Sequence, residues 1–281
     1  EKILFAQTHD YILFFTNLGK VFQTRVFEIP ESSRIAKGQA IVNLIETQSG
    51  ESISSILLYN PNETKVNKYI LMTTKKGTVK KTAVTDFKNI RRTGILAIKM
   101  EAGDELSWVD LTSGEDEVLL VTRDGKIICF GEKQIRPTGR ASQGVRGIKL
   151  ASATDGVVGM NVVSQADRKS ELVIIAENGL GKKTKVDSVR NQNRGGQGVR
   201  IANINEKTGK IVFSAVLDAP EREIIITSLK GQVVKIHTKV IPTLSRNAQG
   251  VILMRFSNKA DKVAAATVVG EEETIENPNL S

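Results

Sequence analysis

Five copies of one pattern, each about fifty residues long, run through this chain of 281 residues. Every copy contains four short apolar runs in the same order, called A, B, C and D here, and nearly all have the character of β-strands. Four-stranded units repeating at this interval are typical of a propeller-like ring, because a sandwich would lack such self-similarity. We therefore expect an all-β fold of antiparallel four-stranded blades in one domain, residues 1–269. The repeats span approximately residues 1–51, 52–105, 106–156, 157–211 and 212–263, followed by a closing strand at 264–269 and a tail at 270–281.

A short glycine turn joins the B run of each repeat to its C run. These turns read NLGK, KKGT, RDGK, ENGL and LKGQ, and glycine supplies the positive φ that tight hairpins need. B and C are thus expected to be antiparallel neighbours. The C runs, such as Lys20–Arg25 and Thr78–Thr82, alternate apolar and basic residues. We therefore expect one face of each C strand to be buried and the other to display cations to solvent.

A sixth A-like run, Ala264–Val269, has no B, C or D run after it. We expect this strand to close a ring by completing a blade whose other strands come from the start of the protein. The chain begins at Glu1, without an initiator methionine and inside a strand pattern, which indicates a fragment of a longer protein. This predicts one further unit before Glu1 and six blades, with the first blade incomplete here. A five-bladed ring with a redundant end strand is the alternative.

The charge of the chain indicates a polyanionic partner. The formal net charge is +9, and without the four acids of the tail 270–281 it becomes +13 on residues 1–269. Nucleic acid ranks ahead of an anionic membrane as the partner, and a protein that merely happens to be basic is the alternative. The single cysteine, Cys129, excludes an internal disulfide framework, and no apolar run approaches the ~18 residues of a transmembrane helix. The tail is expected to be a disordered, solubilising end, with competition against DNA as the alternative.

The segment between C and D carries an arginine and a glycine at a repeated spacing. Aligned on the glycine, which is residue 38, 94, 144, 198 or 250, four repeats have an arginine four residues earlier. The second repeat is tighter and has Arg91 and Arg92 there. A repeated turn explains the glycines but not the arginines or the basic C strand that leads into the same loop. We favour a cationic track with a group of phosphate contacts on each blade.

The candidate DNA-binding residues are the cations of these loops and of the C strands. The loop candidates are Arg34, Lys37, Arg91, Arg92, Arg140, Arg146, Arg194, Arg200 and Arg246. The C-strand candidates are Lys20, Arg25, Lys80, Lys81, Lys126, Lys182, Lys183, Lys185, Lys235 and Lys239.

Other classes of function find little support. His9 and His237 have no partner implied by spacing, and one cysteine excludes CxxC metal pairs. The run Gly179–Thr184 (GLGKKT) lacks the first glycine of a phosphate-binding loop and has Lys183 where Ser or Thr should follow the lysine. We therefore expect no catalytic residue and no metal site. The rival is a protein-interaction propeller, but such a protein should have aromatic or apolar loop tips, whereas these tips are basic.

The repeated R-x-x-x-G loops, together with Glu177–Thr184 (ENGLGKKT) and Ser245–Arg255 (SRNAQGVILMR), resemble the C-terminal domain of the A subunit of bacterial DNA gyrase, a type IIA topoisomerase. The A-type subunit of topoisomerase IV is close kin. The resemblance implies a six-bladed β-pinwheel that binds and wraps double-stranded DNA around its outer edge. It implies that the domain takes part in ATP-dependent negative supercoiling of DNA by the parent enzyme. It also implies that the catalytic tyrosine, the ATPase site and the cofactors ATP and Mg²⁺ lie outside this chain. It also implies a monomeric domain away from membranes, in the bacterial cytoplasm and nucleoid, with the rest of the A subunit and the B subunit as partners in an A2B2 complex.

The hallmark of that family is a seven-residue box, QRRGGKG, on its first blade. Residues 192–198 read QNRGGQG, which matches the box at Gln192, Arg194, Gly195, Gly196 and Gly198. It departs at positions 193 and 197, where asparagine and glutamine replace arginine and lysine, and it lies in the fourth repeat. We interpret it as a degenerate copy, with the true box in the missing unit, and expect DNA binding with impaired wrapping. A topoisomerase IV-type domain that binds without wrapping is the alternative.

Overall fold

The computed structural model describes residues 6–31, 38, 40–60, 68–88, 90–217, 222–258 and 260–269. The chain forms two compact units. The N-terminal unit is made of the described parts of Leu4–Arg168 and Val189–Ile201, and the C-terminal unit of Lys169–Ser188 and the described part of Ala202–Ser281. Short 3-10 helices connect the strands: η1 Val26–Glu28, η2 Ile41–Asn43, η4 Val84–Phe87, η5 Glu132–Gln134, η6 Ala166–Lys169, η7 Val186–Ser188 and η8 Thr238–Val240. Among the described helices, none is long and apolar enough to cross a membrane.

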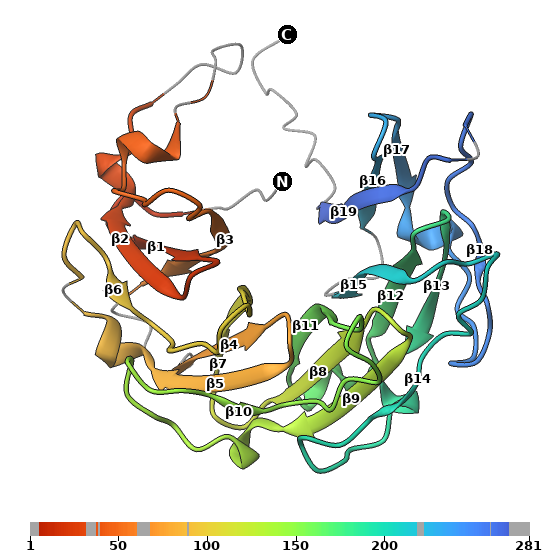
Figure 1. The fold of residues 1–281 in the computed structure, drawn as a ribbon, viewed down its shortest axis with the longest axis horizontal. Helices are drawn as coiled ribbons and strands as arrows, with labels where there is room; N and C mark the ends of the chain where they lie inside the picture. Colours follow the sequence, from red (N-terminus) through yellow and green to blue (C-terminus); the bar gives the residue numbers. More distant parts are fainter. Residues whose placement is uncertain are drawn as a thin grey trace, which may run out of the picture. The chain divides into compact units, whose positions relative to one another are not determined.

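The N-terminal unit contains three four-stranded antiparallel sheets, coloured red to green in Figure 1. The strands of the first sheet, in order across it, are β3 (Ile53–Tyr59), β1 (Tyr11–Thr16), β2 (Lys20–Arg25) and β6 (Ile95–Leu96). Those of the second sheet are β7 (Leu106–Thr112), β4 (Tyr69–Thr74), β5 (Thr78–Ala83) and β10 (Val145–Arg146). Those of the third sheet are β11 (Val157–Val163), β8 (Glu117–Thr122), β9 (Lys126–Gly131) and β14 (Val199–Arg200).

The C-terminal unit contains two further sheets. The fourth sheet runs β15 (Ile211–Leu217), β12 (Glu171–Ala176), β13 (Leu180–Lys185) and β18 (Val251–Ile252). The fifth runs β17 (Val233–His237), β16 (Glu223–Ser228) and β19 (Val263–Val269), so its described part has three strands. The prediction of an all-β fold built from antiparallel four-stranded blades is confirmed.

The predicted B–C hairpins are present in all five sheets. In the second sheet β4 pairs with β5 across the turn at Gly77, whose φ is 85° and whose N–H donates to the Thr74 carbonyl at 3.0 Å. A residue with a Cβ is strained at such a φ, so the glycine is required by the backbone. The B strands are the buried centres of the sheets, and all six residues of β8 are buried.

Each of the first four sheets takes its two outer strands from the repeat that follows, and the described part of the fifth takes one, β19, from the closing strand. In the first sheet, the A run of the second repeat (β3) pairs with β1, with Phe14 opposite Ile56. The D run of the second repeat (β6) pairs with β2, with Lys20 opposite Leu96. Consecutive repeats are therefore interlocked, and a sheet of the structure is not one repeat of the sequence.

The prediction of six blades is wrong, because the described residues form five sheets. The closing strand Ala264–Val269 lies in β19, which pairs with β16 and places Thr267 opposite Ile225. Every A run in the described residues pairs with the B run of the repeat before it. The closing strand is therefore the A run that the fifth sheet requires, and no strand from the start of the protein is needed to explain it. Most of the first A run, Ile3–Thr8, lies outside the described residues.

The hydrophobic cores lie between successive sheets within each unit. Leu13 and Phe15 of the first sheet pack with Ile70 and Met72 of the second, and these four side chains are almost completely buried. A similar cluster joins the second sheet to the third, and another joins the fourth to the fifth. Apolar burial of this kind contributes roughly 1.5–3 kcal/mol for each large side chain, which makes the sheet-to-sheet contacts the main source of stability.

We expect Lys81→Met to lower the free energy of unfolding by about 3 kcal/mol or more, measured by urea denaturation. The Lys81 ammonium lies 3.1 Å from the Glu132 carboxylate, and both side chains are buried. Glu132 also accepts hydrogen bonds from the Thr112 hydroxyl and the Gly114 amide. Removing the lysine would leave a carboxylate buried without its counter-charge, which is strongly destabilising.

Lys133→Met is the matched control for this prediction. Lys133 pairs with Glu115, but both side chains are largely exposed, and such pairs contribute about 0–1 kcal/mol. Equal losses in the two variants would show that the buried pair has no special weight.

Candidate nucleic-acid interface

The loops between C and D end on two-residue edge strands that lie very close to the preceding sheet. A Cβ on Gly144 would come 2.5 Å from the Val79 carbonyl oxygen, and one on Gly250 would come 2.6 Å from the Gly181 carbonyl oxygen. Gly198 has a φ of 69° and lies equally close to the carbonyl of Ile127. At Gly144, Gly198 and Gly250 glycine is thus required by the close approach of two backbones, and at Gly198 and Gly250 by a positive φ as well.

Successive loops of the N-terminal unit are hydrogen-bonded to one another. The Lys99 amide donates to the Ser142 carbonyl at 3.1 Å, and the Lys149 amide donates to the Gly196 carbonyl at 2.8 Å. The Gly195 amide donates in turn to the Gly147 carbonyl at 2.6 Å. The segment that follows β6 is thus joined to the loop before β10, and the segment that follows β10 to the loop before β14, so the chain around these three edge strands forms one continuous surface along three sheets (Figure 1).

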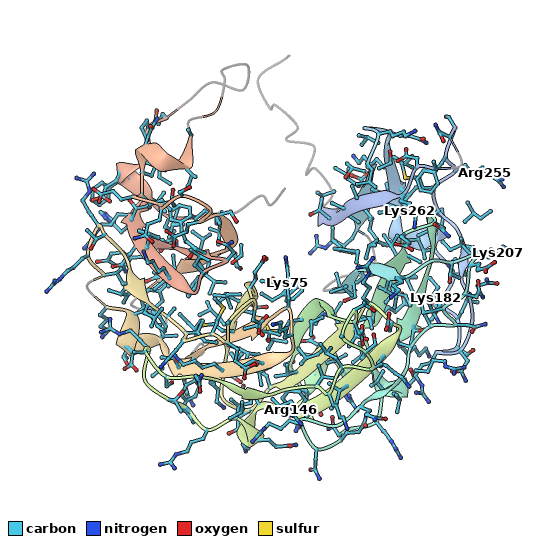
Figure 2. All side chains as sticks on the ribbon, viewed as in Figure 1. Lys75, Arg146, Lys182, Lys207, Arg255 and Lys262 are labelled. Atoms are coloured by element: carbon cyan, nitrogen blue, oxygen red, sulfur yellow. The ribbon has the colours of Figure 1, made fainter. Side chains whose placement is uncertain are left out.

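The loop cations differ in exposure. Arg91, Arg92, Arg146 and Arg200 are exposed, and Figure 2 shows Arg146 extending from β10. Arg140, Arg194 and Arg246 are half-buried. Arg34 and Lys37 lie outside the described residues.

The C-strand cations separate into two groups. Lys185, Lys235 and Lys239 are exposed, while Lys20, Arg25 and Lys126 are half-buried. The other four are buried, and our expectation that they face solvent is wrong: these are Lys80, Lys81, Lys182 and Lys183. Lys80 and Lys81 are neighbours in β5, as are Lys182 and Lys183 in β13, so the two lysines of each pair lie on opposite faces of their strand, and both faces are covered. In this geometry the four ammonium groups are not available to a phosphate in solvent.

The four buried lysines have two kinds of partner. Lys81 and Lys183 pair with carboxylates, those of Glu132 at 3.1 Å and Glu171 at 2.7 Å. Burial favours protonation of Glu171, but hydrogen bonds from Lys183 and Thr243 outweigh it and hold the pKa of that carboxyl below its usual value. Lys80 and Lys182 instead donate to backbone carbonyls of the loops.

The Lys80 and Lys182 ammonium groups are held by the loops that cross above them. Lys80 Nζ donates to the Ala97 carbonyl at 2.6 Å and to the Arg140 carbonyl. Lys182 Nζ donates to the carbonyls of Ser245 and Arg246, both at 2.7 Å. Burial lowers the pKa of each lysine to about 8, and for Lys182 the charge of Arg246 contributes to this shift.

Arg194 uses its side chain to hold its own loop. Its Nε donates to the Gln134 carbonyl at 2.9 Å and its Nη1 to the Arg146 carbonyl at 3.0 Å. Its amide donates to the Gln134 side chain at 2.9 Å. The guanidinium therefore joins this loop to β10, which is a structural role that its spacing in the sequence did not reveal.

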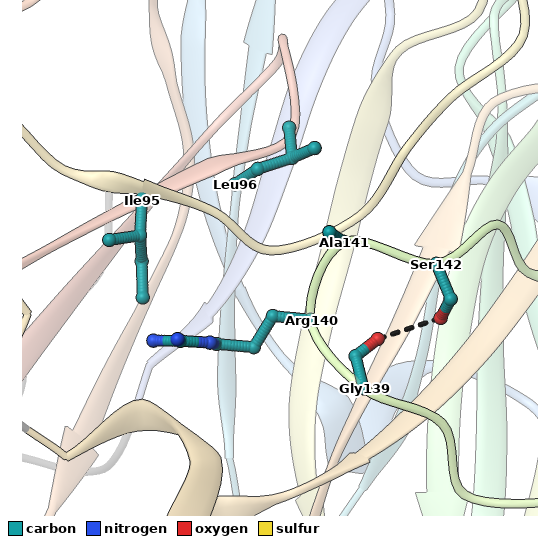
Figure 3. A pocket seen from close by; sticks show the side chains of 6 residues that line it. All are labelled: Ile95, Leu96, Gly139, Arg140, Ala141 and Ser142. Carbon is teal, nitrogen blue, oxygen red and sulfur yellow. Dashed lines mark hydrogen bonds between the residues drawn. The ribbon is translucent and has the colours of Figure 1, made fainter.

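A shallow hollow of about 590 Å³, open to solvent, lies beside Arg140 (Figure 3). Ile95 and Leu96 of β6 line one side and residues Gly139–Ser142 the other, and the Arg140 side chain extends toward Ile95. The Ser142 hydroxyl closes the loop by donating to the Gly139 carbonyl at 2.7 Å. The hollow lacks the enclosure that is typical of a small-molecule site.

Neither a metal cluster nor a reactive thiol is found in the part of the chain that the structure describes. Within it, no group of three or more His, Cys, Asp or Glu residues lies where it could hold a metal ion. Cys129 is buried, and burial together with the Glu117 carboxylate raises the pKa of its thiol to about 12, so it is not a nucleophile at neutral pH.

A family model described as DNA gyrase C-terminal domain, beta-propeller, matches residues 10–60, 68–113, 116–164, 170–218 and 222–270. The chain belongs to this family. Each matched segment starts at or just before a B run and ends with the A run of the next repeat, as the sheets do.

Relatives and solved structures agree with this family. The chain is 38% identical over 274 residues to the DNA gyrase A subunit of Deinococcus deserti, a match that covers 97% of this chain and 33% of the relative. It is 37% identical to the DNA gyrase A subunit of Staphylococcus aureus strain NCTC 8325, with 98% and 31% covered. The chain thus spans about a third of the length of these relatives.

Two solved C-terminal domains have the same fold. One belongs to DNA topoisomerase IV, with a TM-score of 0.84 and 26% identity, and the match covers 94% of this chain and 80% of that one. The other belongs to DNA gyrase A, with a TM-score of 0.76 and 24% identity, and the match covers 94% and 84%.

The structure separates the family's hallmark box into two kinds of position. The matching residues Arg194 and Gly195 shape the loop, since Arg194 holds two carbonyls and Gly195 has a φ of 79°. The departing residues Asn193 and Gln197 are both exposed. The differences from the hallmark therefore remove cations from the surface and leave the fold of the loop intact.

A second repeated cation was not predicted from the sequence. Lys99, Lys149 and Arg255 lie five residues after Gly94, Gly144 and Gly250, respectively. All three are exposed, and Figure 2 shows Arg255 at the surface of the C-terminal unit. These cations could have been found from their fixed spacing after the repeated glycine. The prediction used only the arginines that precede it.

We expect a rise in pH from 7.5 to 9.5 to stabilise the chain relative to its Lys80→Met variant by about 2 kcal/mol, measured by urea denaturation. The pKa of Lys80 falls from 10.5 to about 8 on folding. Between these values the unfolded state binds more protons, so stability rises with pH and the gain is lost as pH falls through 8. Ionisation of Cys129 occurs in both proteins and cancels. A difference that does not change with pH would contradict a buried ammonium.

Proposed function

We propose that this domain binds double-stranded DNA without reading its base sequence, by contacts from the loop surface of the edge strands to phosphates. The observation that carries the proposal is the continuous row of loops that joins β6, β10 and β14, with exposed cations Arg146, Lys149 and Arg200 on it. Membership of the gyrase C-terminal domain family supports it. The surplus of basic residues in the chain has the sign that such a surface needs.

Phosphate contacts suit this surface better than base contacts. The edge strands are two residues long and the helices of the loops are single 3-10 turns, so the described surface has no long helix or ribbon to enter a major groove. Guanidinium groups donate bidentate hydrogen bonds to phosphates. With about five to ten phosphates neutralised, log K should fall with log salt at a slope of roughly −5 to −9.

Bending and wrapping belong to the same proposal. Smooth bending of 20–30 bp through 40–90° costs on the order of 1–6 kcal/mol, so several loops must hold the DNA together. Asn193 and Gln197 are neutral and exposed, so they weaken the contact of their loop with the DNA. We infer that this chain bends DNA and wraps it less strongly than a domain with the full box, in the manner expected of a topoisomerase IV-type domain.

We propose that the parent protein is the A subunit of a type IIA topoisomerase that changes DNA topology at the expense of ATP. The gyrase A subunits of the two relatives are about three times as long as the matched region, which leaves room for the catalytic parts elsewhere. The proposed partners are the rest of the A subunit and the B subunit in an A2B2 complex, with ATP and Mg²⁺ held outside this domain. The proposed place of action is the bacterial cytoplasm and nucleoid.

A protein-interaction role has one observation in its favour. Val233 on β17 and Val240 at the end of η8 are 60% and 70% exposed, and both lie on the fifth sheet or its connection. Exposed apolar side chains at a sheet edge are a common feature of protein contacts. If the affinity for DNA did not change across a salt series, binding of a protein partner would be the better-supported function of this domain.

We expect Arg146→Ala combined with Arg200→Ala to weaken binding to a duplex by on the order of 50-fold at 0.1 M salt, measured by fluorescence anisotropy. Each phosphate contact contributes about 0.9 to the salt slope, so the slope should become shallower by about 2. The loss should be equal for unrelated sequences. Lys75→Ala is the control, because Lys75 is exposed on the β4–β5 turn of the same unit, on a different side from Arg146 (Figure 2). A loss confined to one sequence would contradict phosphate contacts.

We expect Asn193→Arg combined with Gln197→Lys to increase wrapping, measured as the change in linking number of a plasmid relaxed in the presence of the domain. Both positions are exposed, so the new cations can reach a phosphate without disturbing the loop. Ala151→Lys with Ala153→Arg adds the same charge to exposed positions outside the loops and serves as the control. Equal changes in the two double variants would mean that net charge alone decides wrapping.

A further inference from the structure

Two of the five C strands carry a lysine at the same buried register position. Lys80 lies opposite Met72 and Lys182 opposite Ile174. The equivalent residues of the other sheets are apolar: Phe22, Ile128 and Val234. The fold therefore accepts an apolar side chain at this position, and the lysine of the second and fourth sheets needs a reason of its own.

The reason lies in the loop that crosses above each lysine. Lys80 Nζ binds the carbonyl of Arg140, and Lys182 Nζ binds that of Arg246. These are the arginines of the R-x-x-x-G motif in the third and fifth repeats. Two residues before each of these arginines, a backbone hydrogen bond also holds the loop to the C strand. The Thr138 amide donates to the Lys81 carbonyl, and the Leu244 amide donates to the Lys183 carbonyl.

The loop over the apolar Ile128 is held in a different way. Its Gly195 has a φ of 79°, and a Cβ on Gly196 would lie 3.7 Å from the Ile128 side chain, an ordinary contact distance, so this loop passes over an apolar residue that offers it no hydrogen bond. Here the Arg194 guanidinium itself supplies the hydrogen bonds to neighbouring carbonyls. The Lys80 and Lys182 ammonium groups thus do for two loops what Gly195, Gly196 and Arg194 do for the third.

We propose that Lys80 and Lys182 are positioning residues for DNA binding: each holds, from inside the protein, the loop whose arginine contacts a phosphate. The proposal rests on the proposed function, because it assigns these lysines a role toward the same ligand. A buried ammonium that donates to carbonyls forms charge-assisted hydrogen bonds, which are stronger than neutral ones. With a pKa of about 8, both groups are charged at neutral pH.

The positioning role makes a prediction that a direct phosphate contact does not. If Lys182 acts only through Arg246, the effects of replacing the two residues will not add. If Lys182 bound DNA itself, each would remove a separate contact and the effects would multiply.

The test is a double-mutant cycle in the full 281-residue chain with Lys182→Met and Arg246→Ala. Affinity for a duplex of random sequence, long enough to cover the whole loop surface, is measured by fluorescence anisotropy at the same salt concentration throughout. We expect each single variant to weaken binding by about 5–10-fold, which is the effect of one phosphate contact, and the double variant to be no weaker than Arg246→Ala alone. Ile128→Met, at the same position of the third sheet, should leave affinity unchanged.

The possible outcomes separate the two proposals. Multiplied effects in the double variant, or full affinity in Lys182→Met, would overturn the positioning role while leaving DNA binding in place. Full affinity in Arg246→Ala would count against this loop as part of the DNA surface, and the positioning role would fall with it. The cycle of Lys80→Met and Arg140→Ala repeats the test independently in the N-terminal unit.

A compensated variant keeps the test decisive if removal of the ammonium disturbs folding. Lys182→Ile with Asn247→Gly and Ala248→Gly rebuilds at the fourth sheet the combination that Ile128, Gly195 and Gly196 form at the third. We expect circular dichroism to show a folded chain and the affinity to recover at least about 3-fold over Lys182→Ile alone, because part of a 5–10-fold loss is restored. A folded triple variant without recovered affinity would overturn the proposal.

Discussion

The crossing of each D strand to the sheet of the preceding repeat is the interaction on which the rest of this structure depends. Only two residue pairs join β10 to β5 or β18 to β13, so the crossing itself is weak. It requires a glycine where the two backbones approach most closely, at Gly144 and Gly250. Because so short a pairing cannot fix a loop of several residues, other groups must hold it. Buried lysines, the Arg194 side chain and hydrogen bonds between loops do so.

The same crossing explains why an alternating basic strand is buried here. Alternation in Thr78–Ala83 correctly predicts that neighbouring residues face opposite ways. It does not predict what covers each face. Lys80, on one face, meets the backbone carbonyls of Ala97 and Arg140, and Lys81, on the other, meets the carboxylate of Glu132. A lysine can pair with such acceptors because its flexible side chain brings the ammonium donor to a carbonyl or carboxylate that faces inward.

Local features were therefore predictable from the sequence, and contacts between repeats were not. The turn at Gly77 depends on its own four residues, and so it could be read directly. The pairing of Val145 with Val79 joins two repeats, and nothing in either strand specifies the other. The error about six blades has the same origin, since Ala264–Val269 looked surplus only while each repeat was assumed to fill its own sheet. The loop arginines were found by spacing, but the structural task of Arg194 depends on Gln134 and Arg146, far away in sequence.

The box-like loop shows how a family resemblance and a functional capacity can rest on different residues. Arg194, Gly195 and Gly198 shape the path of the backbone in this loop, through hydrogen bonds to carbonyls and through positive φ angles. Asn193 and Gln197 are exposed and contribute nothing to that path. They can change without loss of the fold, and a change there alters the charge that DNA would meet. A match to the box thus identifies the loop architecture, whereas the two positions where this chain differs change only the charge on the surface of the loop.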